Sequence, residues 1–250
     1  MKDTAAGPAS RHIRPNVVAP GLAACLGAIR APAVYRNFII HLVVMIPATV
    51  VMCWVALQLD AWWGWGWAIG PRLSQLAGGL SLGLGAVWVW YVYGYLYLTG
   101  GGSPGTHVDG GPARLVDTGP YTMIRHPSVQ GKLAGVVGLG LLSQSPTFLV
   151  VFVPVLLVYS LITNRYLQER YCEARFGAAY AAYRRVVPML IPRPSGVARW
   201  LKNQPALGAD MASTTTEDPD QISPEFRWYL VGLVTLLAVC GLVWAAIGGA

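Results

Sequence analysis

The chain has 250 residues, of which 54% are hydrophobic and only 12% are charged, and its formal net charge is +7. Soluble domains carry about 25% charged residues, so this composition argues against a soluble core. The polar residues gather between long apolar blocks, which is the pattern of a protein that crosses a membrane several times. The positive charge does not require a nucleic-acid partner, because its placement follows the expected membrane topology.

Residues 1–35 form an N-terminal tail that lacks the uninterrupted apolar stretch of a signal peptide. Its run GLAACLGAI either lies on the membrane surface or belongs to a disordered tail, and the sequence leaves both readings open. The cysteines, Cys25, Cys53, Cys172 and Cys240, are scattered without CxxC spacing. We therefore expect neither a disulfide framework nor a metal site.

The first predicted span covers residues 38–59, and its 22 residues are enough to cross the hydrocarbon layer as a helix. Pro47 is expected to kink it. The segment DAWWGWGWAI that follows has four tryptophans and is typical of an interfacial aromatic belt. A second span is predicted over residues 76–98, where Gly79 and Gly83 form a GxxxG motif that would allow close helix packing.

Two shorter apolar runs follow a polar, glycine-rich stretch, at residues 129–142 and 148–162, and SQSPT separates them. Runs of this length are marginal for a full span, so they predict a helical hairpin that enters and leaves on the same face. The amphipathic stretch 164–185 is expected to return to water. The chain is then expected to continue through a polar linker at 201–226 to a last transmembrane helix at 227–250.

The fold prediction is an all-α integral membrane protein with about five membrane helices, in which residues 36–200 form the main membrane domain. Basic residues lie before the first span, between Arg114 and Lys132, and after Arg165, whereas Arg72 is the one basic residue of the first outward loop. The positive-inside rule therefore puts the N-terminus and both polar clusters of the chain on the cytosolic side.

The first polar cluster is GPYTMIRHPSVQGKL, which stands directly before an apolar run. Pro127 disfavours helix at His126 and can begin the helix that follows. Backbone N–H groups at that helix start, with nearby basic side chains, would form a pocket for a carboxylate or a phosphate, although anchoring to lipid headgroups explains the same cluster. The groups are the N–H of Ser128, Val129 and Gln130 and the side chains of Arg125, His126 and Lys132.

In the second cluster, Glu169 and Glu173 share one helical face, with Arg165 one turn before Glu169. This spacing fits a solvated helix with ion pairs, and it equally fits a carboxylate that binds ribose hydroxyls or a cationic group.

The two clusters together carry a family resemblance. GPYTMIRHPSVQG, followed about 40 residues later by QERYCEARFGAAYAAYRRVVPMLIP, resembles the isoprenylcysteine carboxyl methyltransferases and the related phospholipid methyltransferases. The resemblance covers about residues 100–194, with both halves in order. It implies S-adenosyl-L-methionine as the methyl donor, bound on the cytosolic side. It also implies an acceptor that arrives from the bilayer, such as a prenylcysteine carboxylate, a lipid, or a hydrophobic thiol or amine.

Carried over residue by residue, the resemblance implies a cofactor site and an acceptor site. The cofactor site would comprise Leu115, Val116, Tyr121, Arg125, His126, Pro127, Ser128, Gln130, Gly131, Gln168 and Glu169. Asn164 and Arg165 would bind the acceptor, and Arg165 and Glu169 would be catalytic. The chain departs from the family pattern at Val129, where the family has tyrosine, and at Gln168, where it has glutamate.

Two other readings stay open. A membrane reductase of the sterol reductase type uses NADPH and has a similar SRHPNY.GE signature, but this chain has GPY in place of its GLW and lacks its Asn and Glu. A catalytically degenerate membrane scaffold is the second. No residue decides among the acceptors, and the oligomeric state is left open. The candidate bases, His126 and Glu169, already have cofactor roles, which favours an acceptor that arrives deprotonated.

Overall fold

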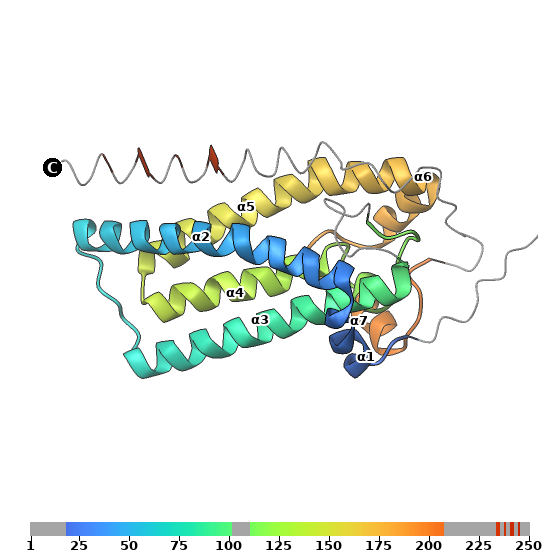
Figure 1. The fold of residues 1–250 in the computed structure, drawn as a ribbon, viewed down its shortest axis with the longest axis horizontal. Helices are drawn as coiled ribbons and strands as arrows, with labels where there is room; N and C mark the ends of the chain where they lie inside the picture. Colours follow the sequence, from blue (N-terminus) through green and yellow to red (C-terminus); the bar gives the residue numbers. More distant parts are fainter. Residues whose placement is uncertain are drawn as a thin grey trace, which may run out of the picture.

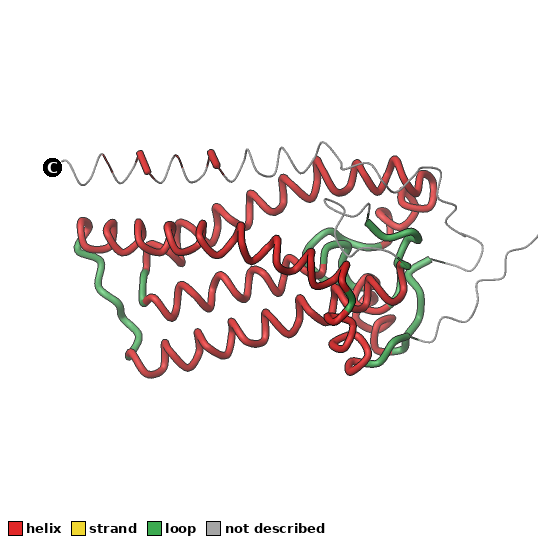
Figure 2. Tube along the Cα trace, viewed as in Figure 1, coloured by secondary structure: helices red, strands yellow, loops and turns green. Residues whose placement is uncertain are grey.

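A computed structural model describes residues 19–101 and 111–207, together with isolated positions between 234 and 245. Of the predicted linker, only residues 201–207 are described. The predicted last transmembrane helix lies outside the described residues except for the isolated positions. The described parts are helices and loops without a strand, which confirms the all-α prediction (Figures 1 and 2). Three described helical runs are long and apolar enough to cross a membrane: Ile46–Trp63, Pro71–Gly100 and Phe148–Val186.

The first two long helices contain the first two predicted spans. Helix α2 (Pro32–Trp63) and helix α3 (Pro71–Gly100) each begin at a proline, whose missing N–H costs nothing in the first turn. Each is followed by a glycine in the left-handed region, Gly64 with φ 69° and Gly101 with φ 68°. Proline and glycine therefore set where both helices begin and end.

Helix α4 (Pro127–Ser143) packs antiparallel on α3 along a seam of small residues. A Cβ at Gly85 would lie 2.5 Å from the carbonyl oxygen of Gly131, and one at Gly78 would lie 2.8 Å from that of Gly138. Side-chain hydroxyls extend the seam, since Ser81 donates a hydrogen bond of 2.8 Å to the carbonyl oxygen of Ala134. The α3 and α4 backbones can approach this closely only because these positions lack side chains.

The predicted GxxxG motif is not part of this seam. A Cβ added at Gly79 or Gly83 meets no atom within 4 Å, so the motif faces away from α4. The prediction that these two glycines mediate close packing is wrong for the described helices, because the neighbouring stripe through Gly78 and Gly85 faces the partner instead.

The predicted hairpin is present, and α2 fastens its turn. Helix α4 leads through Gln144, with φ 54°, into a π-helical turn at Phe148–Phe152 and then into α5 (Val153–Thr163). The buried carboxylate of Asp60, near the end of α2, accepts hydrogen bonds from the Ser145 hydroxyl and from the Thr147 N–H at 2.9 Å. Figure 1 shows α2, α4 and α5 running side by side from this turn.

Helix α5 does not end at residue 163. It continues through a second π-helical turn, Asn164–Gln168, into α6 (Glu169–Val186), so the predicted return to water does not interrupt the helix. Gly177, with φ 49° and ψ −125°, breaks α6 and redirects its last turns.

Short helices complete one end of the bundle, where α3 ends and α4 begins (Figure 1). Helix α1 (Leu22–Gly27) and the 3-10 turn Ala28–Arg30 pack on α3, and helix α7 (Pro194–Leu201) packs on the 3-10 turn Gly119–Thr122. We call this end the basic end, because Arg72 is the only described lysine or arginine at the opposite one.

Candidate functional site

The two polar clusters of the sequence meet at the basic end. The backbone N–H of Arg125 donates a hydrogen bond of 2.9 Å to the carbonyl oxygen of Pro188. The Tyr183 hydroxyl likewise donates to the carbonyl oxygen of Tyr121 at 2.7 Å. Segments about 60 residues apart in sequence are thus fixed to each other by buried hydrogen bonds.

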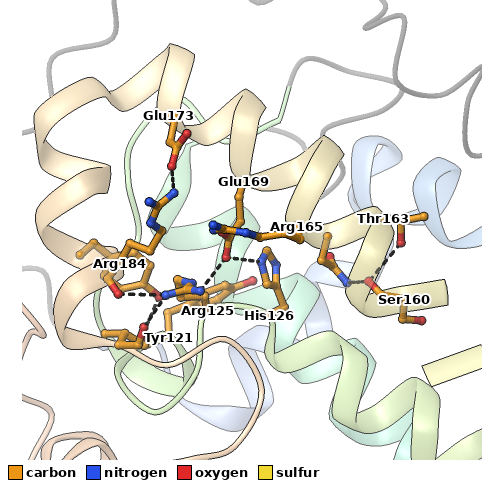
Figure 3. Close-up of polar contacts among 12 residues, drawn as sticks. Tyr121, Arg125, His126, Ser160, Thr163, Arg165, Glu169, Glu173 and Arg184 are labelled. Carbon is orange, nitrogen blue, oxygen red and sulfur yellow. Dashed lines mark hydrogen bonds and ion pairs between the residues drawn. The ribbon is translucent and has the colours of Figure 1, made fainter. Parts of the chain in front are cut away.

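Glu169 is the centre of the contact between the clusters. Its side chain is only 1% exposed, and its Oε1 lies 2.8 Å from Nη2 of Arg125. Its Oε2 lies 2.6 Å from Nη1 of Arg165, whose side chain is 48% exposed. Figure 3 shows Arg125 and His126 pointing at Glu169 from below while Arg165 approaches along the helix. The carboxylate therefore joins α6 to the start of α4.

Arg125 also holds the far end of α6. Its Nη1 donates hydrogen bonds to the carbonyl oxygens of Arg184 at 2.9 Å and Val187 at 2.8 Å. These are carbonyls at the C-terminal end of a helix, which would otherwise lack a helical partner. Arg125 is thus a structural clamp between Glu169 and the end of α6.

His126 lies beside this clamp in a buried position. Burial lowers the pKa of its imidazole, and the neighbouring Glu169 offsets part of that shift. Its Nε2 is 3.6 Å from Oε1 of Glu169, beyond hydrogen-bond distance. We therefore treat the imidazole as neutral near pH 7.

These contacts limit the groups that the predicted anion pocket could offer to a ligand. The charge of Arg125 faces Glu169, and His126 adds no charge. The N–H of Val129 donates to the carbonyl oxygen of His126 at 3.1 Å, so it is not available to a ligand. Lys132 lies on the other side of the α4 start, with its Nζ 5.9 Å from the ring centroid of Tyr93.

A small cavity of about 100 Å³ lies between the two clusters. Eight of the predicted cofactor residues line it: Leu115, Val116, Tyr121, Arg125, His126, Pro127, Ser128 and Gln168. The other three lie elsewhere. Gln130 donates a hydrogen bond to the carbonyl oxygen of Leu190, and Gly131 is part of the α3–α4 seam. Glu169 is enclosed by Arg125 and Arg165, and we call these three residues the ion cluster.

The small cavity is also lined by residues that were not predicted as site residues, among them Tyr93, Phe176 and Tyr180. Tyr180 is 2% exposed, and its hydroxyl has no hydrogen-bond partner among the described residues. The spacing FGAAYAAY was a signal for it, and the break in α6 at Gly177 lies three residues before it.

A second, larger cavity of about 720 Å³ lies between α2, α3, α4 and α5. Its walls are mainly aliphatic, and the predicted acceptor residue Asn164 is among its polar lining residues. Arg165 lines neither cavity. The two cavities share four lining residues: Tyr93, Ser128, Lys132 and Gln168. They therefore meet at one place, which we call the junction.

Residues 73–176 match the model of the phospholipid methyltransferase family. This segment is therefore similar to the phospholipid methyltransferases. The match confirms the predicted family resemblance and extends from α3 to the middle of α6, so it contains the junction and Glu169. The comparisons found no match among curated proteins or solved structures.

Within the matched segment, both departures from the family pattern lie near the junction. Val129 is buried and lines the large cavity, and Gln168 lines both cavities. The tyrosine hydroxyl and the carboxylate that the family pattern has here are replaced by an aliphatic group and a neutral amide.

Proposed function

We propose that the protein transfers the methyl group of S-adenosyl-L-methionine to an acceptor that reaches the site from the bilayer. The observation that carries this proposal is the junction. A small cavity lined by eight predicted cofactor residues meets a large apolar cavity at Ser128 and Gln168.

Several residues of the small cavity are of the kinds that the cofactor would need. Leu115, Val116 and Phe176 offer an apolar surface to an adenine ring. The buried Tyr180 hydroxyl lacks a protein partner and could bond a polar group of the ligand. When bound, the cofactor supplies a methyl group on a positively charged sulfonium. The protein's residues hold and orient it and exclude water.

The large cavity suits the acceptor. Its lining residues Ile46, Val50 and Trp54 on α2 stay 53%, 61% and 44% exposed, so the cavity is open to the surroundings of the bundle. A lipid, a prenylcysteine carboxylate, or a hydrophobic thiol or amine could enter there. Alignment of two bound reactants can lower the barrier by roughly 7–11 kcal/mol.

The basic end would then be cytosolic, because basic residues favour that side of a membrane. Among the described lysines and arginines, only Arg72 lies at the opposite end. This places the small cavity where a water-soluble cofactor is available. The family match favours methyl transfer over the NADPH-dependent reduction that the RHP motif also allows.

The test is transfer of labelled methyl into lipid. The protein in nanodiscs made from a total membrane lipid extract is incubated with methyl-labelled S-adenosyl-L-methionine, and the label in the organic phase is counted. Transfer should require the protein and should be lost when Ser128→Phe fills the junction. Ser195→Phe, at an exposed position of α7, is the matched control. Equal transfer by Ser128→Phe and wild type would refute the junction as the reaction site.

A further inference from the structure

Lys132 lies at the junction with its charge near the apolar cavity. It is in the second turn of α4 and lines both cavities, and its Nζ is 5.9 Å from the ring centroid of Tyr93. Among the described residues that line the large cavity, Lys132 is the only charged one. Any acceptor that enters through this cavity must bring its reacting group close to this ammonium.

The surroundings of the junction strengthen the positive field. The neighbouring ion cluster contains two guanidinium groups, Arg125 and Arg165, against the single carboxylate of Glu169, and the buried His126 is neutral. Charges act more strongly beside an apolar, water-poor cavity than in water. An ammonium headgroup would be repelled here, and an anion would be attracted.

Among the residues that the structure describes, the junction also offers no base to an acceptor that must lose a proton. Apart from Lys132, the described polar residues that line the large cavity carry no charge, among them Ser128, Tyr159, Ser160, Thr163, Asn164 and Gln168. Glu169 is held by two arginines, and His126 faces Glu169. An ammonium becomes a nucleophile only after deprotonation, whereas a carboxylate or thiolate is one already.

We propose that Lys132 selects acceptors whose reacting group is an anion, a carboxylate or a thiolate on a lipophilic chain. The proposal rests on the methyl transfer proposed above. A lone pair of the anion forms the new bond to the methyl carbon while the carbon–sulfonium bond breaks and leaves its electrons on sulfur. The negative and positive charges disappear together, and no proton moves. Lys132 is thus a residue that determines specificity, through the charge it presents to the acceptor.

The first experiment measures acceptor binding without the cofactor. The protein in neutral nanodiscs binds a fluorescent fatty acid, which is displaced by a long-chain carboxylate, or by the thiol or the amine of the same chain length. We expect the carboxylate to bind at least about tenfold more tightly than the amine, as charge-assisted hydrogen bonds allow. Lys132→Met should remove that preference and Lys132→Arg should keep it. Lys202→Met, at an exposed lysine, is the control. Equal or tighter binding of the amine by wild type overturns the proposal.

The second measurement separates acceptor from cofactor, since the methionine part of the cofactor also has a carboxylate. The affinity for S-adenosylhomocysteine is titrated for wild type and Lys132→Met. Unchanged affinity, with the carboxylate preference lost, supports the proposal. A loss confined to S-adenosylhomocysteine would mean that Lys132 holds the cofactor, and would overturn it. Absence of S-adenosylhomocysteine binding by wild type would count against the proposed function, while the displacement assay would still judge Lys132. Labelled methyl in the carboxylate or the thiol then tells which anion reacts.

Discussion

At the residue scale, Glu169 determines the geometry of the site. Its buried carboxylate, beside Arg125 and Arg165, fixes the start of α4 against α6. Arg125 in turn donates a hydrogen bond to a carbonyl oxygen at the end of α6. A buried charge is stable only with its partners in place, so the cluster is sensitive to loss of any one of them.

Glu169→Gln should therefore destabilise the protein by about 3–5 kcal/mol, because it leaves the buried guanidinium of Arg125 without its carboxylate. Glu173→Gln is the matched change four residues on. Its side chain is 41% exposed and pairs with Arg184, so we expect about 0–1 kcal/mol. Unfolding in detergent measures both, and similar losses for the two variants would contradict the account.

The buried imidazole of His126 should make the stability of the protein depend on pH. Because burial lowers the pKa of the folded imidazole, the unfolded chain takes up a proton at a higher pH than the folded protein does. The contribution of His126 to the free energy of unfolding is fully present above the unfolded pKa of about 6.5, and it is lost as the pH falls toward the folded pKa. The unfolding temperature of wild type should thus fall more between pH 7.5 and 5 than that of His126→Gln. Parallel curves would show that His126 does not titrate in this way.

At the element scale, the α3–α4 seam positions the junction. The sequence predicted both helices to within a few residues, because apolar length, proline and glycine act locally. It did not predict the packing face, because Gly78 and Gly85 stand beside Gly79 and Gly83 and only the partner helix distinguishes them. Tyr180 was not predicted as a site residue for a similar reason, since it follows the break in α6 at Gly177, whose geometry a regular helical pattern does not give.

A pair of alanine substitutions tests the seam. Gly85→Ala places a Cβ 2.5 Å from a backbone oxygen of α4 and should cost roughly 1–3 kcal/mol, with loss of methyl transfer as the junction shifts. Gly79→Ala meets no atom within 4 Å and should be neutral or stabilising by up to about 1 kcal/mol. Thermal unfolding of both variants in detergent is the measurement, and the reverse order of stability would exclude this seam.

At the scale of the whole molecule, two cavities with different linings meet inside one helical bundle. Eight of the eleven predicted cofactor residues line the small one, because the family motif carried their identity. The large cavity could not be predicted, and neither could the position of Lys132 in the lining of both cavities, because these features arise from the packing of four helices.

The orientation of the bundle is testable with single cysteines in a cysteine-free background. Arg193→Cys, beside α7 at the basic end, should be protected from a membrane-impermeant maleimide in intact cells, and Arg72→Cys at the opposite end should be labelled. Permeabilised cells give the control, since both positions should then react. Labelling of Arg193→Cys alone in intact cells would invert the topology.

The most direct test of the central claim, that the small cavity holds the methyl donor, is calorimetric titration with S-adenosylhomocysteine. We predict micromolar binding by wild type and about 2–10-fold weaker binding by Tyr180→Phe, whose hydroxyl should bond the ligand. Without ligand, Tyr180→Phe should be as stable as wild type, because the lost hydroxyl had no partner among the described residues. Tyr166→Phe, at an exposed tyrosine outside both cavities, should bind like wild type. No binding by wild type, or equal affinity for wild type and Tyr180→Phe, would contradict the account.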